Sequence, residues 1–182
     1  MKKTAYISSL RNFRVWHRFT GLALFFFIFL SALTGIFLAW KKDAGWIQPP
    51  TESGSTKDLA EWLPIDSLNK IAAAAFYQKY PAQTGNQIDR MDVRPSKGIV
   101  KMLFEKGWWE VQVDGKTGAV LSISRRHSDW IEQIHDGSII SDFFKLISMN
   151  VLGIGLSAMV ITGFWLWLGP KKYRKQKNRQ SG

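Results

Sequence analysis

Two long stretches of the chain, residues 19–40 and 146–169, contain no charged residue. An apolar stretch of about 20 residues is what a helix needs to cross a hydrocarbon core roughly 30 Å thick. A core helix of a soluble protein rarely stays apolar on all sides for that length. The first stretch is also too long for a cleavable signal peptide and lacks a small-residue cleavage site. We therefore predict two membrane-spanning helices, at 19–40 and 135–169, the second including its entry segment.

The segment between these helices changes its pattern along its length. Residues 48–58 are polar and turn-forming, so we expect residues 41–63 to be a linker. Apolar residues then follow at helical spacing, and Tyr80-Pro81 ends this predicted helix. The helix is predicted to begin the inserted domain, which we place at residues 64–134.

The remainder of the inserted domain alternates between apolar and polar residues. Runs of this kind occur at 100–105, 109–113 and 119–124, and glycine-containing turns separate them. Such runs predict consecutive β-hairpins. A helix on one face of a small antiparallel sheet is the economical arrangement of these elements. The predicted fold class is therefore a membrane α-helical protein with two transmembrane helices and an inserted small α+β domain.

Charge predicts the orientation in the membrane. The chain has a formal net charge of +11, and its flanks, residues 1–18 and 170–182, carry Lys and Arg but no acidic residue. Short flanks rich in Lys and Arg stay in the cytoplasm. We therefore expect a bacterial inner-membrane protein with both termini cytoplasmic and a periplasmic central domain. Attraction to the anionic lipid of the bilayer accounts for the basic flanks, so we predict no nucleic-acid partner.

A set of short motifs occurs in order along the chain. They are Trp16-His17-Arg18, Leu33-Thr34-Gly35, the turn Asp114-Gly115-Lys116-Thr117-Gly118, His135-Asp136-Gly137 and Ile161-Thr162-Gly163. In these motifs the chain resembles the PepSY-associated transmembrane-helix family, and the turn resembles the hairpin of its PepSY module. Members of that family include haem-containing membrane reductases that reduce ferric iron or ferric siderophores at the periplasmic face. The resemblance implies a PepSY-like inserted domain and haem-dependent electron transfer. Longer members have more spanning helices, which leaves open whether this chain carries the complete electron path.

Two of the three histidines lie at the predicted membrane faces. His17 is near the cytoplasmic end of the first helix, and His135 precedes the second helix on the outer side. Imidazole is a common axial ligand of haem iron. About 30 Å of bilayer separates the two faces, so the two histidines cannot bind one iron. A two-fold homodimer would supply a matching histidine at each face. We predict His17 and His135 as ligands of haem b shared across a homodimer.

Other polar residues near these histidines have alternative interpretations. Asp136 either orients an imidazole as a hydrogen-bond acceptor or caps the second helix. His127 is interpreted as a solvated surface residue. Four outer carboxylates either hold ferric iron loosely through oxygen ligands or form a solvated face; they are Asp129, Glu132, Asp136 and Asp142.

Small and hydroxyl-bearing residues occur within both spanning helices. Gly153 and Ser157 form a small-xxx-small pair, which serves either self-association or packing of the two helices within the chain. Thr34 and Thr162 are expected only to return their hydroxyls to the backbone of their own helices.

Two functions remain open on the sequence. The first is an inner-membrane b-type haem protein, an oxidoreductase that reduces ferric iron at the periplasmic face and supports iron uptake. Its partners would be a quinol or protein donor, ferric iron or a ferric siderophore, and a ferrous iron transporter. The alternative is a non-enzymatic accessory or regulatory protein whose PepSY-like domain binds a peptide or partner.

The chain contains no cysteine, which excludes thiolate metal sites and a cysteine nucleophile.

Overall fold

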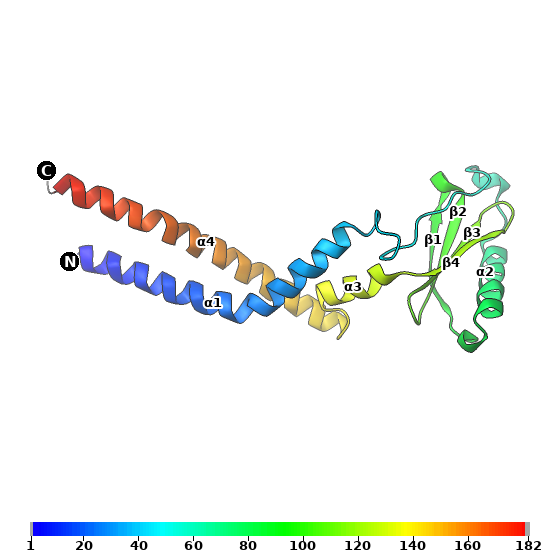
Figure 1. Ribbon diagram of the computed structural model, residues 1–182, viewed down its shortest axis with the longest axis horizontal. Helices are drawn as coiled ribbons and strands as arrows, with labels where there is room; N and C mark the ends of the chain where they lie inside the picture. The colour runs from blue at the N-terminus through cyan, green and yellow to red at the C-terminus, as the bar shows by residue number, and fades with distance from the viewer. Residues whose placement is uncertain (1, 181–182) are drawn as a thin grey trace. The chain divides into compact units, whose positions relative to one another are not determined.

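The computed structural model describes the backbone of residues 2–180 and the side chains of residues 8–171 (Figure 1). The chain forms two compact units, which we describe separately. Residues 1–35 and 133–182 are called the helix unit, and residues 36–132 the sheet unit.

Two long helices make up most of the helix unit: α1 (Lys2–Ala39) and α4 (Asp142–Gln180). Within them, Ser8–Ala39 and Asp142–Lys171 are long and apolar enough to cross a membrane. Most of their apolar side chains are exposed on the outside of the helix pair, where lipid replaces water as the solvent. Residues 19–39 of the first expected span lie within α1, and residues 142–169 of the second lie within α4; each helix also extends beyond its span.

Glycines mediate the contact between α1 and α4. A Cβ atom built on Gly21 would lie 3.1 Å from the Met159 Cε atom, and one on Gly155 would overlap Leu24. Gly153 has no such neighbour within 4 Å and lies on an exposed part of α4. Close approach within the chain is thus tightest at Gly155, and Gly153 is free for another surface.

The entry to the second span is a separate helix. α3 (His127–Asp136) ends one residue before Gly137, whose φ of 82° reverses the chain. The Ser141 hydroxyl accepts a hydrogen bond from the Phe144 backbone N–H at 3.0 Å and caps the first turn of α4. The segment expected to run from 135 into the second span is therefore a helix end, a turn and a new helix.

A four-stranded antiparallel sheet and one helix form the sheet unit. The helix is α2 (Ile65–Lys79), and short 3₁₀ helices lie at η1 (Leu59–Glu61), η2 (Pro81–Gln83) and η3 (Pro95–Lys97). The strands are β1 (Ile88–Arg94), β2 (Ile99–Phe104), β3 (Trp109–Asp114) and β4 (Val120–Arg125), paired in that order. The predicted helix and consecutive hairpins are confirmed.

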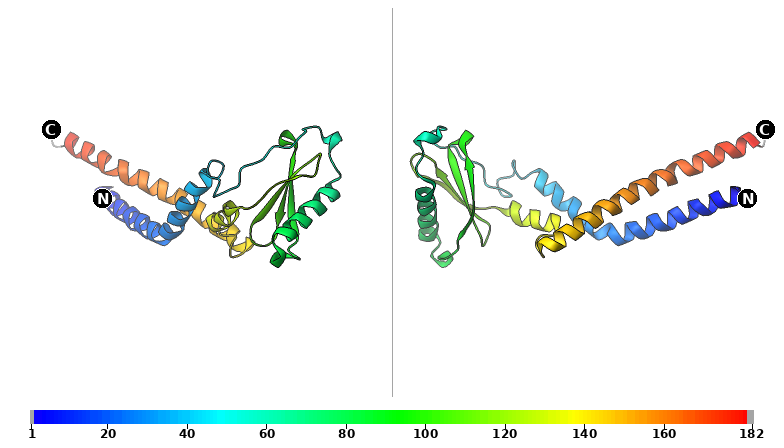
Figure 2. Two further views of the ribbon diagram at one scale, coloured as in Figure 1. Left: turned by 45° about the vertical axis from the view of Figure 1, so that its right-hand side comes forward. Right: turned by 180° about the vertical axis from the view of Figure 1, so that it is seen from behind.

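The core of this unit lies between α2 and one face of the sheet (Figure 2). Leu68, Ala72 and Phe76 are fully buried and recur every fourth residue, so one stripe of α2 faces the strands. The strands contribute alternate residues to the same core, including Val100, Met102, Val111 and Val113.

One strand has no counterpart in the sequence prediction. β1 carries a register shift between Ile88 and Arg90. The extra residue moves Met91 and Val93 out of alternation with Ile88, so the period of two is hidden.

The second face of the sheet is covered by residues 47–58, which we call the strap. The Ser55 backbone N–H donates to Asp114 Oδ2 at 2.7 Å, and the Glu52 N–H donates to the Gln112 side chain at 2.9 Å. Ile47 is only 1% exposed. The expected linker at 41–63 is therefore wrong for the strap, which is an ordered part of the unit.

A charged cluster lies buried on that second face. Lys101 Nζ is 3.2 Å from Glu110 Oε1, and their side chains are 2% and 0% exposed. Arg126 approaches the other oxygen of Glu110 at 2.9 Å. The alternation of β2 and β3 was predicted correctly, but these polar positions face protein and not water.

Candidate functional site

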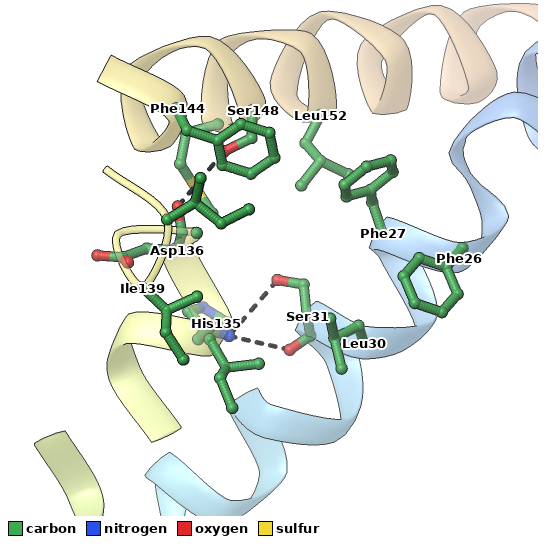
Figure 3. A pocket seen from close by; sticks show the side chains of 14 residues that line it. Phe26, Phe27, Leu30, Ser31, His135, Asp136, Ile139, Phe144, Ser148 and Leu152 are labelled. Carbon is green, nitrogen blue, oxygen red and sulfur yellow. Dashed lines mark hydrogen bonds between the residues drawn. The ribbon is translucent and has the colours of Figure 1, made fainter. Parts of the chain in front are cut away.

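His135 lies in the last turn of α3 and points toward α1 (Figure 3). Its Nδ1 atom is 3.0 Å from the Ser31 carbonyl oxygen and 3.0 Å from Thr34 Oγ1. A carbonyl oxygen only accepts, so Nδ1 carries the hydrogen. In the neutral imidazole Nε2 then keeps its lone pair for a ligand.

His17 lies on α1 and meets α4 in a similar way. Its Nδ1 atom is 2.8 Å from Thr162 Oγ1. The Thr162 hydroxyl has a single hydrogen, which it donates to the Ala158 carbonyl at 2.7 Å. The hydroxyl oxygen therefore accepts from His17 Nδ1–H, and Nε2 of His17 is also left with its lone pair.

A glycine lies beside each imidazole. A Cβ atom built on Gly35 would lie 3.4 Å from the Cε1 atom of His135, and one on Gly163 would lie 3.4 Å from that of His17. Each histidine thus rests on a Thr-Gly pair of a long helix: His135, from α3, on the pair of α1, and His17, from α1, on the pair of α4. The same arrangement occurs at both ends of the helix pair.

The threonines do more than the sequence predicted. Thr34 and Thr162 do return their hydroxyls to their own helices, to Leu30 and Ala158, each at 2.7 Å. Their oxygens also bind the two imidazoles, so the expectation of a backbone role alone is wrong. The signal in the sequence was the repeated Thr-Gly pair, but its partner lies more than a hundred residues away.

Asp136 does not take the role predicted for it. Its carboxylate accepts from the Ser138 N–H at 2.9 Å and pairs with Lys145 at 2.5 Å, whereas His135 Nδ1 bonds to Ser31 and Thr34. Burial raises the pKa of Asp136, but the bonds from Lys145 and Ser138 outweigh this and hold the pKa below its ordinary value. Asp136 is thus the ionised last residue of α3, and its side chain holds the turn that follows and does not cap α4.

Three of the four carboxylates considered for iron contact pair with cations, and one of these is Asp136, which pairs with Lys145. Asp129 accepts from Arg126 at 3.1 Å, and Glu132 lies 3.8 Å from Lys41. Among the described residues, no three His, Cys, Asp or Glu side chains are grouped to hold a metal ion. The structure therefore gives no support to the predicted iron contact at these acids. His127 is half-buried and accepts a hydrogen bond from the Trp130 indole at 3.3 Å.

A small cavity lies beside His135. It has a volume of about 160 Å³ and is lined mainly by apolar side chains of α1, α4 and the turn between α3 and α4, including Phe27, Leu30, Ile139 and Leu152 (Figure 3). Pockets for drug-sized ligands occupy roughly 300–1,000 Å³. The ligand chemistry of His135 suits haem iron, but this cavity is too small to enclose a porphyrin without a further protein surface.

The two histidines form separate sites. His17 lies on α1, and His135 contacts the same helix at Thr34. At a rise of about 1.5 Å per residue, His17 and Thr34 are about 25 Å apart along α1. One iron cannot bind both histidines.

The comparison with protein families covers both sites. The model of the family described as the PepSY-associated TM region matches residues 14–181. The chain belongs to this family. Membership in the PepSY-associated TM region family makes it a membrane protein and confirms the predicted fold class, two membrane helices with an inserted α+β domain. No curated protein and no solved structure matches the chain.

Proposed function

We propose that this member of the PepSY-associated TM region family is a b-type haem electron-transfer protein that reduces ferric iron or a ferric siderophore. The observation that carries the proposal is the repeated histidine site. At both ends of the helix pair an imidazole is anchored through Nδ1 and keeps its Nε2 lone pair. Neutral imidazole nitrogen is a standard ligand of haem iron, and an anchored Nδ1–H raises its basicity.

His17 and His135 would each be a ligand of haem b at a separate site, and haem when bound supplies one-electron chemistry. Thr162 fixes the orientation of His17, and Ser31 and Thr34 fix that of His135. Lys145 forms an ion pair with Asp136, so the negative charge next to His135 is compensated. Reduction of Fe³⁺ to Fe²⁺ takes one electron, which matches such a cofactor.

A homodimer completes this proposal. Each site offers one histidine, and the cavity beside His135 is smaller than a porphyrin requires. A second copy related by a two-fold axis supplies the matching histidine and the missing surface. Gly153, exposed on α4 and without a neighbour, is available to such a contact.

The direction of electron flow follows from charge. The basic flanks support an orientation with both termini in the cytoplasm of a bacterial cell and the sheet unit in the periplasm. His17 then lies at the inner face and His135 at the outer face of the inner membrane. Electrons from a quinol or a partner protein would reach ferric iron outside, and a ferrous iron transporter would use the product.

A visible difference spectrum tests the proposal. The full chain is purified in detergent from haem-supplemented cells, and dithionite-reduced and oxidised spectra are compared for wild type, His17→Ala, His135→Ala and the control His127→Ala. We expect a sharp low-spin b-type signal that either site variant loses or alters and the control keeps. A featureless wild-type spectrum would refute haem binding and favour the accessory, partner-binding function.

A further inference from the structure

The two histidines differ in how many acceptors hold Nδ1. His135 Nδ1 has the Ser31 carbonyl and Thr34 Oγ1, each at 3.0 Å, and the Ser31 hydroxyl at 3.4 Å. Within the described part of the chain, the hydrogen bond of His17 goes to Thr162 Oγ1 alone, at 2.8 Å. The anchoring is therefore redundant at His135 and single at His17.

We infer that Thr162 is the positioning residue that sets the tautomer of His17, and that Thr34 is its partly redundant counterpart at His135. The Thr162 hydroxyl hydrogen is committed to the Ala158 carbonyl at 2.7 Å, with Met159 O at 3.2 Å. Its oxygen can then only accept, and an imidazole facing it must present Nδ1–H. Thr162 thus turns Nε2 of His17 into the ligand atom.

The geometry favours this role over a purely structural one. Intrahelical bonding satisfies a threonine hydroxyl without any second partner. Here both threonines are followed by a glycine whose absent side chain leaves room for Cε1 of the ring at 3.4 Å. A hydroxyl and a glycine in succession lie against the ring edge that carries Nδ1 and Cε1, once on each long helix.

The consequence is an asymmetric response to substitution. Thr162→Val keeps the shape of the side chain but removes the acceptor, so His17 loses control of its tautomer. Thr34→Val leaves His135 the Ser31 carbonyl, which still demands Nδ1–H. Because partners of this kind typically change metal affinity about 10–100-fold, Thr162→Val should weaken ligand binding at His17 by about that factor, and Thr34→Val should weaken binding at His135 less.

The tautomer itself can be measured without any cofactor. The haem-free full chain, labelled with ¹⁵N-histidine, is studied in detergent at pH 8. Two-bond ¹⁵N–¹H couplings distinguish Nδ1–H from Nε2–H, and His→Gln variants assign the three histidines. We expect Nδ1–H for His17 and His135 in the wild type, loss of that preference for His17 in Thr162→Val, rescue in Thr162→Ser, and no change for His135 in Thr34→Val.

The possible results separate this inference from the proposed function. The inference takes only the identity of the ligand, haem, from the proposed function. An unchanged His17 tautomer in Thr162→Val would overturn the inference even if the protein binds haem. The expected tautomers in a protein that takes up no haem would sustain the inference and refute the proposed function. An equal loss in Thr34→Val and Thr162→Val would contradict the claimed redundancy at His135.

Discussion

Replacing Glu110 with Gln tests how much the buried ion pairs on the second face of the sheet contribute to stability. Glu110 is 0% exposed and its carboxylate serves two cations, Lys101 at 3.2 Å and Arg126 at 2.9 Å. Gln112 Nε2 donates to the same carboxylate at 2.7 Å. Arg126 keeps Asp129 as a second anion, but Glu110 is the anion that Lys101 contacts among the described residues. The amide would leave Lys101 buried and uncompensated.

The cost follows from the burial of both partners. Removing one member of a buried ion pair destabilises by about 3–5 kcal/mol, because the other charge stays desolvated. Replacing both members with neutral side chains avoids that penalty. Lys101→Met combined with Glu110→Gln should therefore be more stable than Glu110→Gln alone by about 2 kcal/mol, because no unpaired charge stays buried.

Hydrogen exchange of the full chain measures these differences locally. The exchange of β2 and β3 peptides is followed by mass spectrometry, and protection is converted into a free energy of opening. Glu61→Gln is the matched control, because its salt bridge to Lys116 at 2.9 Å is exposed and should matter little. A loss below about 1 kcal/mol in Glu110→Gln, or a double variant no more stable than the single one, would refute the burial argument.

Three further predictions concern other parts of the fold. Burial raises the pKa of Asp114, but hydrogen bonds from Thr117, Ser55 and Lys116 hold this pKa below its ordinary value of 3.8. The ionised carboxylate therefore stabilises the fold fully above pH 3.8, and this stabilisation is lost as the pH falls through the lower pKa of the folded state. Asp114→Asn should lower stability at pH 7 and flatten the acid unfolding curve of the sheet unit below about pH 4; an unchanged curve would contradict this. Gly54→Ala would overlap the Gly98 carbonyl, so limited proteolysis should cut the strap faster than in wild type, and equal rates would mean that the strap is a free linker. Gly155→Val would overlap Leu24, whereas Gly153→Val meets open space within the chain, and overpacking costs about 1–3 kcal/mol. Because the chain has no cysteine of its own, spin labels can be attached at single introduced cysteines on α1 and α4. The distance between the labels should increase only in Gly155→Val.

The local signals in the sequence were sufficient for the main elements. The spans could be predicted because a helix needs an apolar stretch of about 20 residues to cross a bilayer, and the family match agrees with them. The repeat of Leu68, Ala72 and Phe76 predicted α2, and alternation predicted β2 to β4. β1 was missed because its bulge breaks the period of two. The histidines could be singled out because the chain has only three.

What the tertiary structure alone decided is which distant groups meet. The strap contains turn-forming residues typical of a linker, and only its bonds to Gln112 and Asp114 make it part of the sheet unit. Thr162 is 145 positions from His17, and Thr34 is 101 from His135. A hydroxyl satisfied within its own helix gives no sign of a second partner in the sequence. The sequence therefore determined which elements form and where the histidines lie, and folding determined which nitrogen each histidine presents, because that depends on acceptors from the opposite helix.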